Sequence, residues 1–299
     1  MKIAFLSQMG FQGKIPRNHP NMRTEFAQMC ALKSYHYPLS TIDNIVEKYD
    51  HVILLIPKTD RDREALLPVD LVTKARKFAN KVWFMQEGPN WIFQDMSIAQ
   101  QFWHYNLLAD VDGILTENKT DIPYFKGLVG DVKPIHDIPS LMIEDSFAHN
   151  DIIHESDREG VIIGGNFVRW YGGFDSYIMA REFNIPISSV SMGRKQKEED
   201  MIPDISYLPY LTWSAGQFPL NCAYLGIPCI GYEEADTQRI LHPSLSVKIG
   251  DTAKARELVC KIRDNKDFYV HCSKTAKENF NNLFSEKIFV EKMKNRLIC

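Results

Sequence analysis

The segment WSAGQFPLNCAYLGIPCIGYEE, residues 213–234, decides the fold class. Small residues lead into an amphipathic stretch at 217–225, which predicts a helix that Gly226 ends. The apolar run 228–232 then predicts a buried strand. The first backbone N–H groups of a helix attract phosphate oxygens, so Gly216, Gln217 and Phe218 are candidate phosphate contacts. Asn221, one turn further along, lies where it can reach a ribose hydroxyl.

The alternation of short apolar runs and amphipathic stretches continues along the rest of the chain, as is typical of parallel strands joined by crossover helices. It predicts an α/β protein with two Rossmann-like halves. The expected strands are residues 2–6, 51–56, 82–86, 113–116 and 132–135 in the first half, and 160–165, 187–191, 205–208, 228–232 and 246–249 in the second. Further helices of the second half are expected near 173–183, 252–263 and 267–282.

Amphipathic stretches in the first half predict three helices that cover a sheet. Their expected buried faces are Met22, Phe26, Met29 and Cys30; Leu71, Ala75, Phe78 and Ala79; and, after a Ser97 cap, Ile98, Phe102, Tyr105 and Ala109. The end of the chain carries another apolar stripe, formed by Phe284, Ile288, Phe289, Met293 and Leu297. We expect a final helix there that crosses back to the first domain.

A polar stretch at 145–159 is the best candidate for the connection between two domains. We therefore expect a first, acceptor-binding domain at 1–150, completed by the helix at 284–299. A second, nucleotide-binding domain is expected at 158–283.

Composition excludes several classes of protein. The 299 residues include 35 basic and 38 acidic side chains, and the net charge of −3 argues against a nonspecific nucleic-acid binder while permitting a local basic face. The longest apolar run, Val52–Ile56, is far shorter than the roughly 20 residues of a membrane span. The six cysteines form no Cys-x-x-Cys pair, so we expect reduced cysteines, no structural metal and a cytoplasmic protein.

Ligands of open α/β sheets bind beyond the carboxyl ends of the strands, so the residues after each strand are the first candidates. The loop Ser7–Gly13 follows the first strand, and Gly10 allows a ligand to approach its backbone. Glu87 follows the third strand and is the candidate general base. A surface acid in a turn is the alternative interpretation of Glu87, and Asp95 and His104 are alternative bases.

Two turns of the second half suit a diphosphate. Gly164 and Gly165 allow close approach at a strand end, and Arg169 can make a two-pronged charged contact. Gly193 and Arg194 repeat the pattern after the next strand. Plain turns with solvated charges are the alternative interpretation of both. A polar cluster that suits a hydroxyl-rich ligand follows the 228–232 strand and consists of Glu233, Glu234, Asp236 and Gln238.

The run Leu225-Gly226-Ile227-Pro228-Cys229-Ile230 resembles the helix, Gly-x-Pro and strand element of GT-B glycosyltransferases, which hold a nucleotide-sugar near their C-terminus. Many members place a ribose-binding glutamate five residues before the glycine, where this chain has Asn221. The resemblance implies the GT-B fold, with two Rossmann-like domains facing a central cleft and a UDP-sugar on the second domain.

Four stretches are similar to bacteriophage DNA glycosyltransferases that act on 5-hydroxymethylcytosine, especially the β-glucosyltransferase kind. They are Met1–Ala4 with Met9-Gly10, Trp83–Glu87, Gly164–Phe167 with Arg169, and Glu233–Ile240. This resemblance implies an inverting transfer in which Glu87, in place of an aspartate, takes the proton of the acceptor hydroxymethyl group. It also implies double-stranded DNA as a partner and the host cytoplasm as the location of a phage-encoded enzyme.

DNA would be received by a basic mouth made of Lys14, Arg17, Arg23 and Arg61, with Asn90 and Trp91 as further acceptor contacts. The net charge counts against DNA, because duplex binding draws heavily on lysine and arginine. A bacterial surface glycan or lipid-linked sugar is therefore the alternative acceptor, and a non-catalytic two-domain ligand-binding module is the alternative function. Glucose, arabinose and N-acetylglucosamine are all open as the transferred sugar.

The tripeptide Asp110-Val111-Asp112 matches the Asp-x-Asp manganese signature of the other large glycosyltransferase fold. It stands between a predicted helix end and a predicted strand start, on the wrong side of the sheet for a ligand. We therefore expect no metal site there and no cofactor besides the UDP-sugar cosubstrate. A divalent ion is not required for the chemistry, although it can aid product release in such enzymes.

Overall fold

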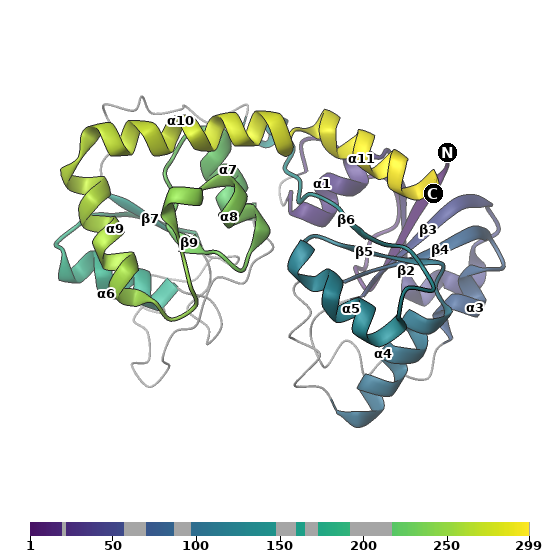
Figure 1. Ribbon diagram of the computed structural model, residues 1–299. Coiled ribbons are helices and arrows are strands. Elements are labelled where there is room, and N and C mark those ends of the chain that lie inside the picture. Colours follow the sequence, from purple (N-terminus) through teal and green to yellow (C-terminus); the bar gives the residue numbers. More distant parts are fainter. Residues whose placement is uncertain are drawn as a thin grey trace. The chain divides into compact units, whose positions relative to one another are not determined.

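The computed structural model describes residues 1–19, 22–56, 70–86, 97–147, 160–164, 173–191 and 217–298. The chain divides into two compact units, Met1–Ala148 with Phe284–Cys299, and His149–Leu283 (Figure 1). Both units contain parallel strands and helices, which confirms the α/β class. Within the described ranges, none of the helices combines the length and the apolar character needed to cross a membrane.

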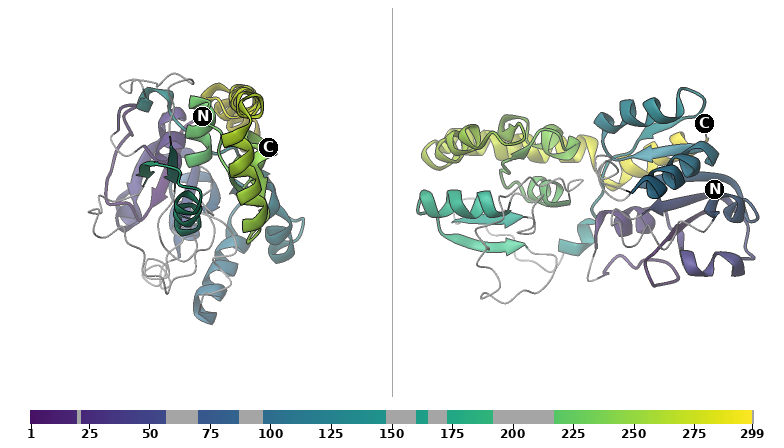
Figure 2. Two further views of the ribbon diagram at one scale, coloured as in Figure 1. Left: turned by 90° about the vertical axis from the view of Figure 1, so that its left-hand side faces the viewer. Right: turned by 90° about the horizontal axis from the view of Figure 1, so that it is seen from below.

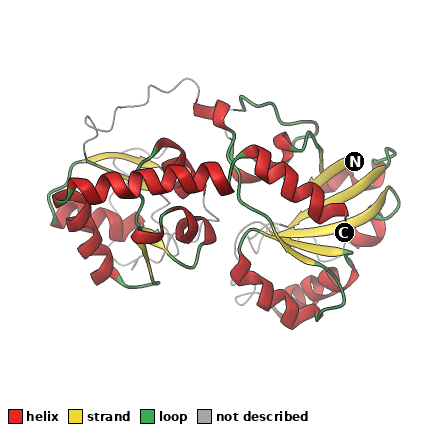
Figure 3. Cartoon of the chain, turned by 45° about the horizontal axis from the view of Figure 1, so that its top comes forward, coloured by secondary structure: helices red, strands yellow, loops and turns green. Residues whose placement is uncertain are grey.

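A six-stranded parallel sheet forms the centre of the first unit, with strand order β2-β1-β3-β4-β5-β6. Figure 3 shows the strands of this sheet in yellow. Its strands are β1 (Ile3–Ser7), β2 (Tyr35–Pro38), β3 (Tyr49–Ile56), β4 (Ala79–Gln86), β5 (Gly113–Thr116) and β6 (Ile135–Asp137). The predicted strand at 132–135 begins three residues later than expected. The edge strand β2 was not predicted, because Tyr35-His36-Tyr37-Pro38 is short and ends in a proline.

Helices cover both faces of this sheet (Figure 2). The helices are α1 (Thr24–Ala31), α3 (Leu71–Ala75), α4 (Ile98–Asp110), α5 (Ile122–Val129) and α11 (Glu286–Ile298), with short 3-10 turns at Leu39–Asn44, Lys119–Asp121 and Glu144–Phe147. Alternate strand residues point to opposite faces, so Leu54 and Phe84 pack with α3, α4 and α5 while Ile53 and Met85 pack with α1 and α11. The predicted buried faces of the first two helices are confirmed for Phe26, Met29 and Cys30, and for Leu71, Ala75 and Phe78.

The predicted buried face of α4 is wrong. Ile98, Phe102 and Tyr105 are 73%, 65% and 48% exposed, and the helix buries another face, formed by Gln100, His104, Leu107 and Leu108. Apolar residues occur all around this helix, so periodicity alone does not select a face. Leu107 and Leu108 determine which face of α4 is buried, because both pack in the core beside the sheet. The His104 ring on the same face makes an edge contact with Phe84 at a centroid distance of 5.3 Å.

The last helix belongs to the first unit, as predicted. Phe289, Met293 and Leu297 of α11 are almost fully buried and pack with Phe5 and Trp83 on the sheet. The first unit therefore combines segments from the two ends of the chain.

Two short parallel sheets occur in the described part of the second unit, β7–β8 and β9–β10. The strands are β7 (Val161–Gly164), β8 (Ile187–Ser191), β9 (Gly231–Tyr232) and β10 (Ser246–Val247); the helices are α6 (Gly173–Glu182), α7 (Gln217–Leu225), α8 (Asp236–Leu241), α9 (Thr252–Asp264) and α10 (Lys266–Leu283), with a 3-10 turn at Pro243–Leu245. The predictions for α7 and β8 are confirmed to the residue, whereas β9 and β10 are shorter than expected. The predicted strand at 205–208 lies outside the described residues.

Candidate functional site

The carboxyl edge of the six-stranded sheet carries the first group of candidate residues. In this sheet, β1 lies between β2 and β3. The chain places β2 on one side of β1 and then adds β3 to β6 in order on the other side, so the strand order reverses at β1. Open α/β sheets bind ligands beyond the carboxyl ends of the strands at such a switch point. The loop Ser7–Gly13, which leaves the end of β1, is therefore a candidate ligand-binding segment of this unit.

A buried serine and histidine hold this loop. The Ser7 hydroxyl lies 2.7 Å from Nε2 of His36, on the neighbouring strand β2, and it accepts a hydrogen bond from the Met9 N–H at 3.1 Å. Nδ1 of His36 lies 2.8 Å from the Phe11 carbonyl oxygen. Because His36 is fully buried, burial lowers its pKa to about 4. Sequence reasoning missed this pair, since nothing local in the sequence connects position 7 with position 36.

The two glycines of the loop differ in what they require. Gly13 has a φ of +135°, which side chains rarely adopt, and it forms an antiparallel bridge with His36. Gly10 is exposed, and a Cβ atom built there would meet nothing within 4 Å. Backbone conformation thus explains Gly13, whereas neither conformation nor packing requires a glycine at position 10, which leaves room for a ligand to approach the backbone.

A second polar group follows β5 at the same edge of the sheet. The Glu117 carboxylate accepts a hydrogen bond from Gln28 Nε2 of α1 at 2.7 Å and another from the Ser140 hydroxyl at 3.2 Å. Gln28 is buried, and its Oε1 atom has no hydrogen-bond partner in the described part of the chain. Glu117 is a fixed, partly exposed carboxylate at this edge that sequence reasoning did not single out.

The predicted basic mouth is largely engaged in ion pairs within the first unit. Arg17 binds the carboxylates of Asp145 and Glu286, with N–O distances of 2.6 and 2.9 Å. Arg23 pairs with Glu25 at 2.8 Å. Lys14 is exposed and makes no ion pair with the described residues. Of these three cations, Lys14 is the one whose charge the described residues leave unbalanced.

In the second unit, α7 begins at Gln217, where the sequence predicts the start of a helix. Gln217 and Phe218 in its first turn are partly exposed, and Asn221 lies one turn later. The Oδ1 atom of Asn221 is buried and has no hydrogen-bond partner in the described ranges. Gly226 ends the helix with a φ of +67°, and its carbonyl oxygen accepts a hydrogen bond from the Ser273 hydroxyl of α10 at 2.6 Å.

The polar cluster after β9 divides into structural and available groups. Gln238 is buried and its amide donates to the Cys229 carbonyl oxygen at 2.8 Å, while Asp236 is paired with Arg239. The Glu234 carboxylate accepts from the Ile249 N–H at 3.1 Å through one oxygen, and the other oxygen has no partner among the described residues. Glu233 is partly exposed. The two glutamates are partly exposed whereas Asp236 and Gln238 are buried, so the glutamates are better placed to bind a ligand.

The other predicted site residues lie outside the described residues, except that Gly164 ends β7. Those outside are the candidate base Glu87, the donor candidates Gly165, Arg169, Gly193, Arg194 and Gly216, and the acceptor candidates Arg61, Asn90 and Trp91.

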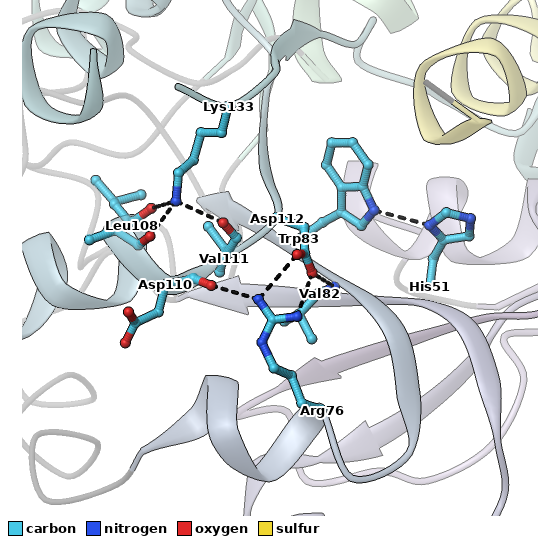
Figure 4. A network of polar contacts seen from close by, with 10 residues as sticks. His51, Arg76, Val82, Trp83, Leu108, Asp110, Val111, Asp112 and Lys133 are labelled. Atoms are coloured by element: carbon cyan, nitrogen blue, oxygen red, sulfur yellow. Dashed lines mark hydrogen bonds and ion pairs between the residues drawn. The ribbon is translucent and has the colours of Figure 1, made fainter. Parts of the chain in front are cut away.

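The Asp-x-Asp tripeptide serves the architecture of the sheet (Figure 4). The Asp112 carboxylate accepts hydrogen bonds from Arg76 at 2.9 and 3.1 Å and from the Val82 N–H at 2.7 Å. Beside it, Lys133 donates to three carbonyl oxygens at the end of α4, and burial lowers the pKa of its ammonium group. Across the described ranges, no three His, Cys, Asp or Glu side chains gather as a metal site would require.

Comparison with known proteins gave no matching family model and no matching curated protein. Solved structures do match. Sucrose-phosphate synthase from Thermosynechococcus elongatus aligns with a TM-score of 0.59 and 12% identity, over 98% of this chain and 97% of its own. TarM aligns with a TM-score of 0.53 and 11% identity, over 82% of this chain and 54% of its own. This chain thus spans about half the length of TarM.

A second TarM structure, from S. aureus and in complex with fondaparinux, alpha-GlcNAc-glycerol and UDP, aligns with a TM-score of 0.51 and 13% identity, over 82% of this chain and 55% of its own. The DNA-modifying β-glucosyltransferase aligns over 99% of both chains at 13% identity, but its TM-score of 0.46 is too low to support an argument. The likeness to sucrose-phosphate synthase and TarM shows the fold, which is that of the GT-B glycosyltransferases.

Proposed function

We propose that this chain is a glycosyltransferase that moves a sugar from a UDP-sugar to an acceptor hydroxyl. The observation that carries the proposal is the likeness to sucrose-phosphate synthase along 98% of the chain, together with α7 and its Gly226 end at the position of the sequence element that resembles GT-B enzymes. The UDP in the TarM complex supports a uridine nucleotide as the donor carrier.

The second unit would hold the nucleotide and diphosphate of the donor, and Gly10 of the first unit would contact its sugar. The N-terminal amides of α7, beside Gly216 and Gln217, would meet the diphosphate together with Arg169 and Arg194, and the glycines 164, 165 and 193 would allow its approach. Asn221, Glu233 and Glu234 would bind hydroxyl groups of the ribose or sugar. Such donors speed the reaction because they stabilise the negative charge that develops on the departing UDP.

The first unit would supply the acceptor and the base. Glu87 would take the proton of the acceptor hydroxyl as its oxygen attacks the anomeric carbon, and the bond to UDP would break with inversion at that carbon. No metal is assigned a role in this step. We expect transfer to persist in EDTA, and complete loss of activity in EDTA would reject this part of the proposal.

A ligand panel tests the donor. Melting temperatures measured with UDP-glucose, UDP-N-acetylglucosamine and UDP-arabinose should rise for the true donor, because a ligand that binds only the folded state stabilises it. Release of free UDP then separates an enzyme from a binding module that only closes around a ligand. Glu87→Gln should retain the thermal shift and lose turnover; unchanged turnover removes Glu87 from the role of base.

For the acceptor, we propose 5-hydroxymethylcytosine in DNA on the strength of the sequence resemblance. The ion pairs of Arg17 and Arg23 favour the second candidate, a surface glycan or lipid-linked sugar, because they neutralise two of the cations that a duplex would need. Co-expression with a hydroxymethylating system, followed by nucleoside mass spectrometry of the DNA, separates the two. Glycosylated hydroxymethylcytidine supports DNA, and its absence beside UDP release on a glycan or lipid acceptor supports the second candidate.

A further inference from the structure

One buried histidine contacts the Ser7–Gly13 loop at its beginning, middle and end. Its ring nitrogens meet the Ser7 hydroxyl and the Phe11 carbonyl oxygen, at 2.7 and 2.8 Å. Its ring also stacks on Phe11 at a centroid distance of 4.1 Å, and its backbone exchanges two hydrogen bonds with Gly13, at 2.8 and 3.0 Å. The loop conformation therefore depends on His36 of the neighbouring strand.

The partners of His36 determine its tautomer. The Phe11 carbonyl oxygen can only accept, so the proton of the neutral ring lies on Nδ1. Nε2 then accepts from the Ser7 hydroxyl, whose oxygen in turn accepts the Met9 N–H. Each donor in this series of hydrogen bonds, from the Met9 N–H to the Phe11 carbonyl oxygen, therefore faces an acceptor. Above pH 6.5 the ring is neutral, because burial lowers its pKa to about 4.

Between Ser7 and Phe11, Gly10 is the residue that this arrangement exposes. Gln8 and Met9 are partly exposed, and Gly10 is exposed with free space around it. Phe11 is anchored from its other side by Phe26 of α1, at a ring distance of 5.3 Å. Met9 packs against the core of the first unit, so the loop is fixed at Ser7, Met9 and Phe11 and exposes Gly10 at the switch point of the sheet.

We infer that His36, as the neutral Nδ1–H tautomer, is a positioning residue that works through Ser7 and Phe11 to hold the loop so that Gly10 contacts the substrate. This inference rests on the proposed function, since it takes the loop to bind the sugar-nucleotide or its transferred sugar. Glycine at position 10 then serves close approach of that ligand. His36 itself, being fully buried, does not touch the ligand.

The tautomer is tested first, and independently of any activity. Long-range ¹H–¹⁵N spectra of ¹⁵N-histidine protein at pH 7 should show His36, assigned by its disappearance in His36→Asn, with its proton on Nδ1. Hydrogen exchange should show slow exchange of the Met9 amide, accelerated by Ser7→Ala. A proton on Nε2, or a Met9 amide indifferent to Ser7→Ala, would overturn the inference.

Ligand binding is tested with matched variants. His51 is a second buried histidine of the same sheet, on β3; in the described part of the chain its side chain interacts with Trp83, whose Nε1 donates to its Nδ1 at 3.0 Å. We expect Ser7→Ala and His36→Asn to weaken binding of the UDP-sugar, or raise its KM, by about tenfold. His51→Asn should leave both values unchanged, even where it lowers the melting temperature.

These measurements distinguish a failure of the inference about His36 from a failure of the proposed function. If the wild type binds a UDP-sugar and the three variants weaken binding equally, or none does, positioning by His36 is rejected while the proposed function stands. If the wild type binds no UDP-sugar, the proposed function falls and the ligand-contact part of the inference falls with it. Weakening confined to the Ser7 and His36 variants supports both.

Discussion

Arg17 donates two hydrogen bonds to the Glu286 carboxylate, at 2.9 and 3.0 Å, although 269 positions separate the two residues. The same guanidinium binds Asp145. Asp145 lies just before the chain leaves the first unit at Ala148, and Glu286 lies just after it returns at Phe284. One arginine therefore links the two segments of the first unit that flank the second unit, one before His149 and one after Leu283.

Removal of Arg17 should loosen the start of α11. Because the groups are partly exposed, we expect Arg17→Ala to cost about 1 kcal/mol of stability or less, and to speed hydrogen exchange in the first turns of α11. Arg263→Ala is the control, since Arg263 pairs with its neighbour Asp264 and its guanidinium lies over the Phe183 ring, both in the second unit. Equal exchange of α11 in both variants would contradict a tie made by Arg17.

The face that α4 buries can be checked by two substitutions. Leu108 is fully buried and Phe102 is 65% exposed, although the sequence pattern suggested that Phe102 is in the core. We expect Leu108→Ala to destabilise the protein by about 2–5 kcal/mol and Phe102→Gln to change stability by less than about 1 kcal/mol. Urea denaturation measures both. A larger loss of stability from Phe102→Gln than from Leu108→Ala would show that the face predicted from the sequence is the buried one.

Gly113 is required by its neighbour in the sheet. A Cβ atom at this position would lie 2.2 Å from Cζ3 of Trp83, a fully buried ring that cannot easily move. Gly113→Ala should therefore destabilise the first unit by roughly 1–3 kcal/mol or prevent its folding. Gly127→Ala is the matched control in α5, where an added Cβ meets nothing within 4 Å; it should raise stability by roughly 0.5–1 kcal/mol.

Acid should destabilise the protein through two buried histidines. Burial lowers the pKa of His36 and of His242 to about 4, against roughly 6.5 in the unfolded chain. The unfolded state binds each proton first, so stability is complete above pH 6.5 and declines as the pH falls toward 4. Each histidine should contribute a slope of about 1.4 kcal/mol per pH unit in this window.

Urea denaturation between pH 7.5 and 5 measures the slope, above the range where most carboxylates titrate. His242→Gln should reduce the dependence of the free energy of unfolding on pH by the contribution of one histidine, whatever its effect on stability at pH 7.5. An unchanged slope would show that His242 takes up its proton equally in the folded and unfolded states.

Elements with local end signals could be predicted closely from sequence. The helix at 217–225 ends at Gly226, whose positive φ suits glycine, and the predicted strands 113–116 and 187–191 match β5 and β8. The boundaries of these elements are determined by residues that are close in the sequence. The final helix was predictable too, because its apolar stripe required a surface to cover.

The features that sequence reasoning missed are those that distant residues decide. Strand β2 is short, and it is a strand because β1 pairs with it, from Ala4–Tyr35 to Ser7–Pro38. Arg17 looked like a cation for phosphate until Asp145 and Glu286 met it in space. His36 had no pattern to mark it, since its role comes from Ser7 and Phe11.

The sheet of the first unit keeps one face incomplete during synthesis. Phe289, Met293 and Leu297 pack against Phe5 and Trp83 only after the entire second unit has been translated. At roughly 5–20 residues per second, this leaves an apolar face open for on the order of 10 s after residue 148 is made. Chaperones that bind nascent chains therefore have a defined target on this protein, and ribosome stalling between residues 149 and 285 should expose it to aggregation or proteolysis.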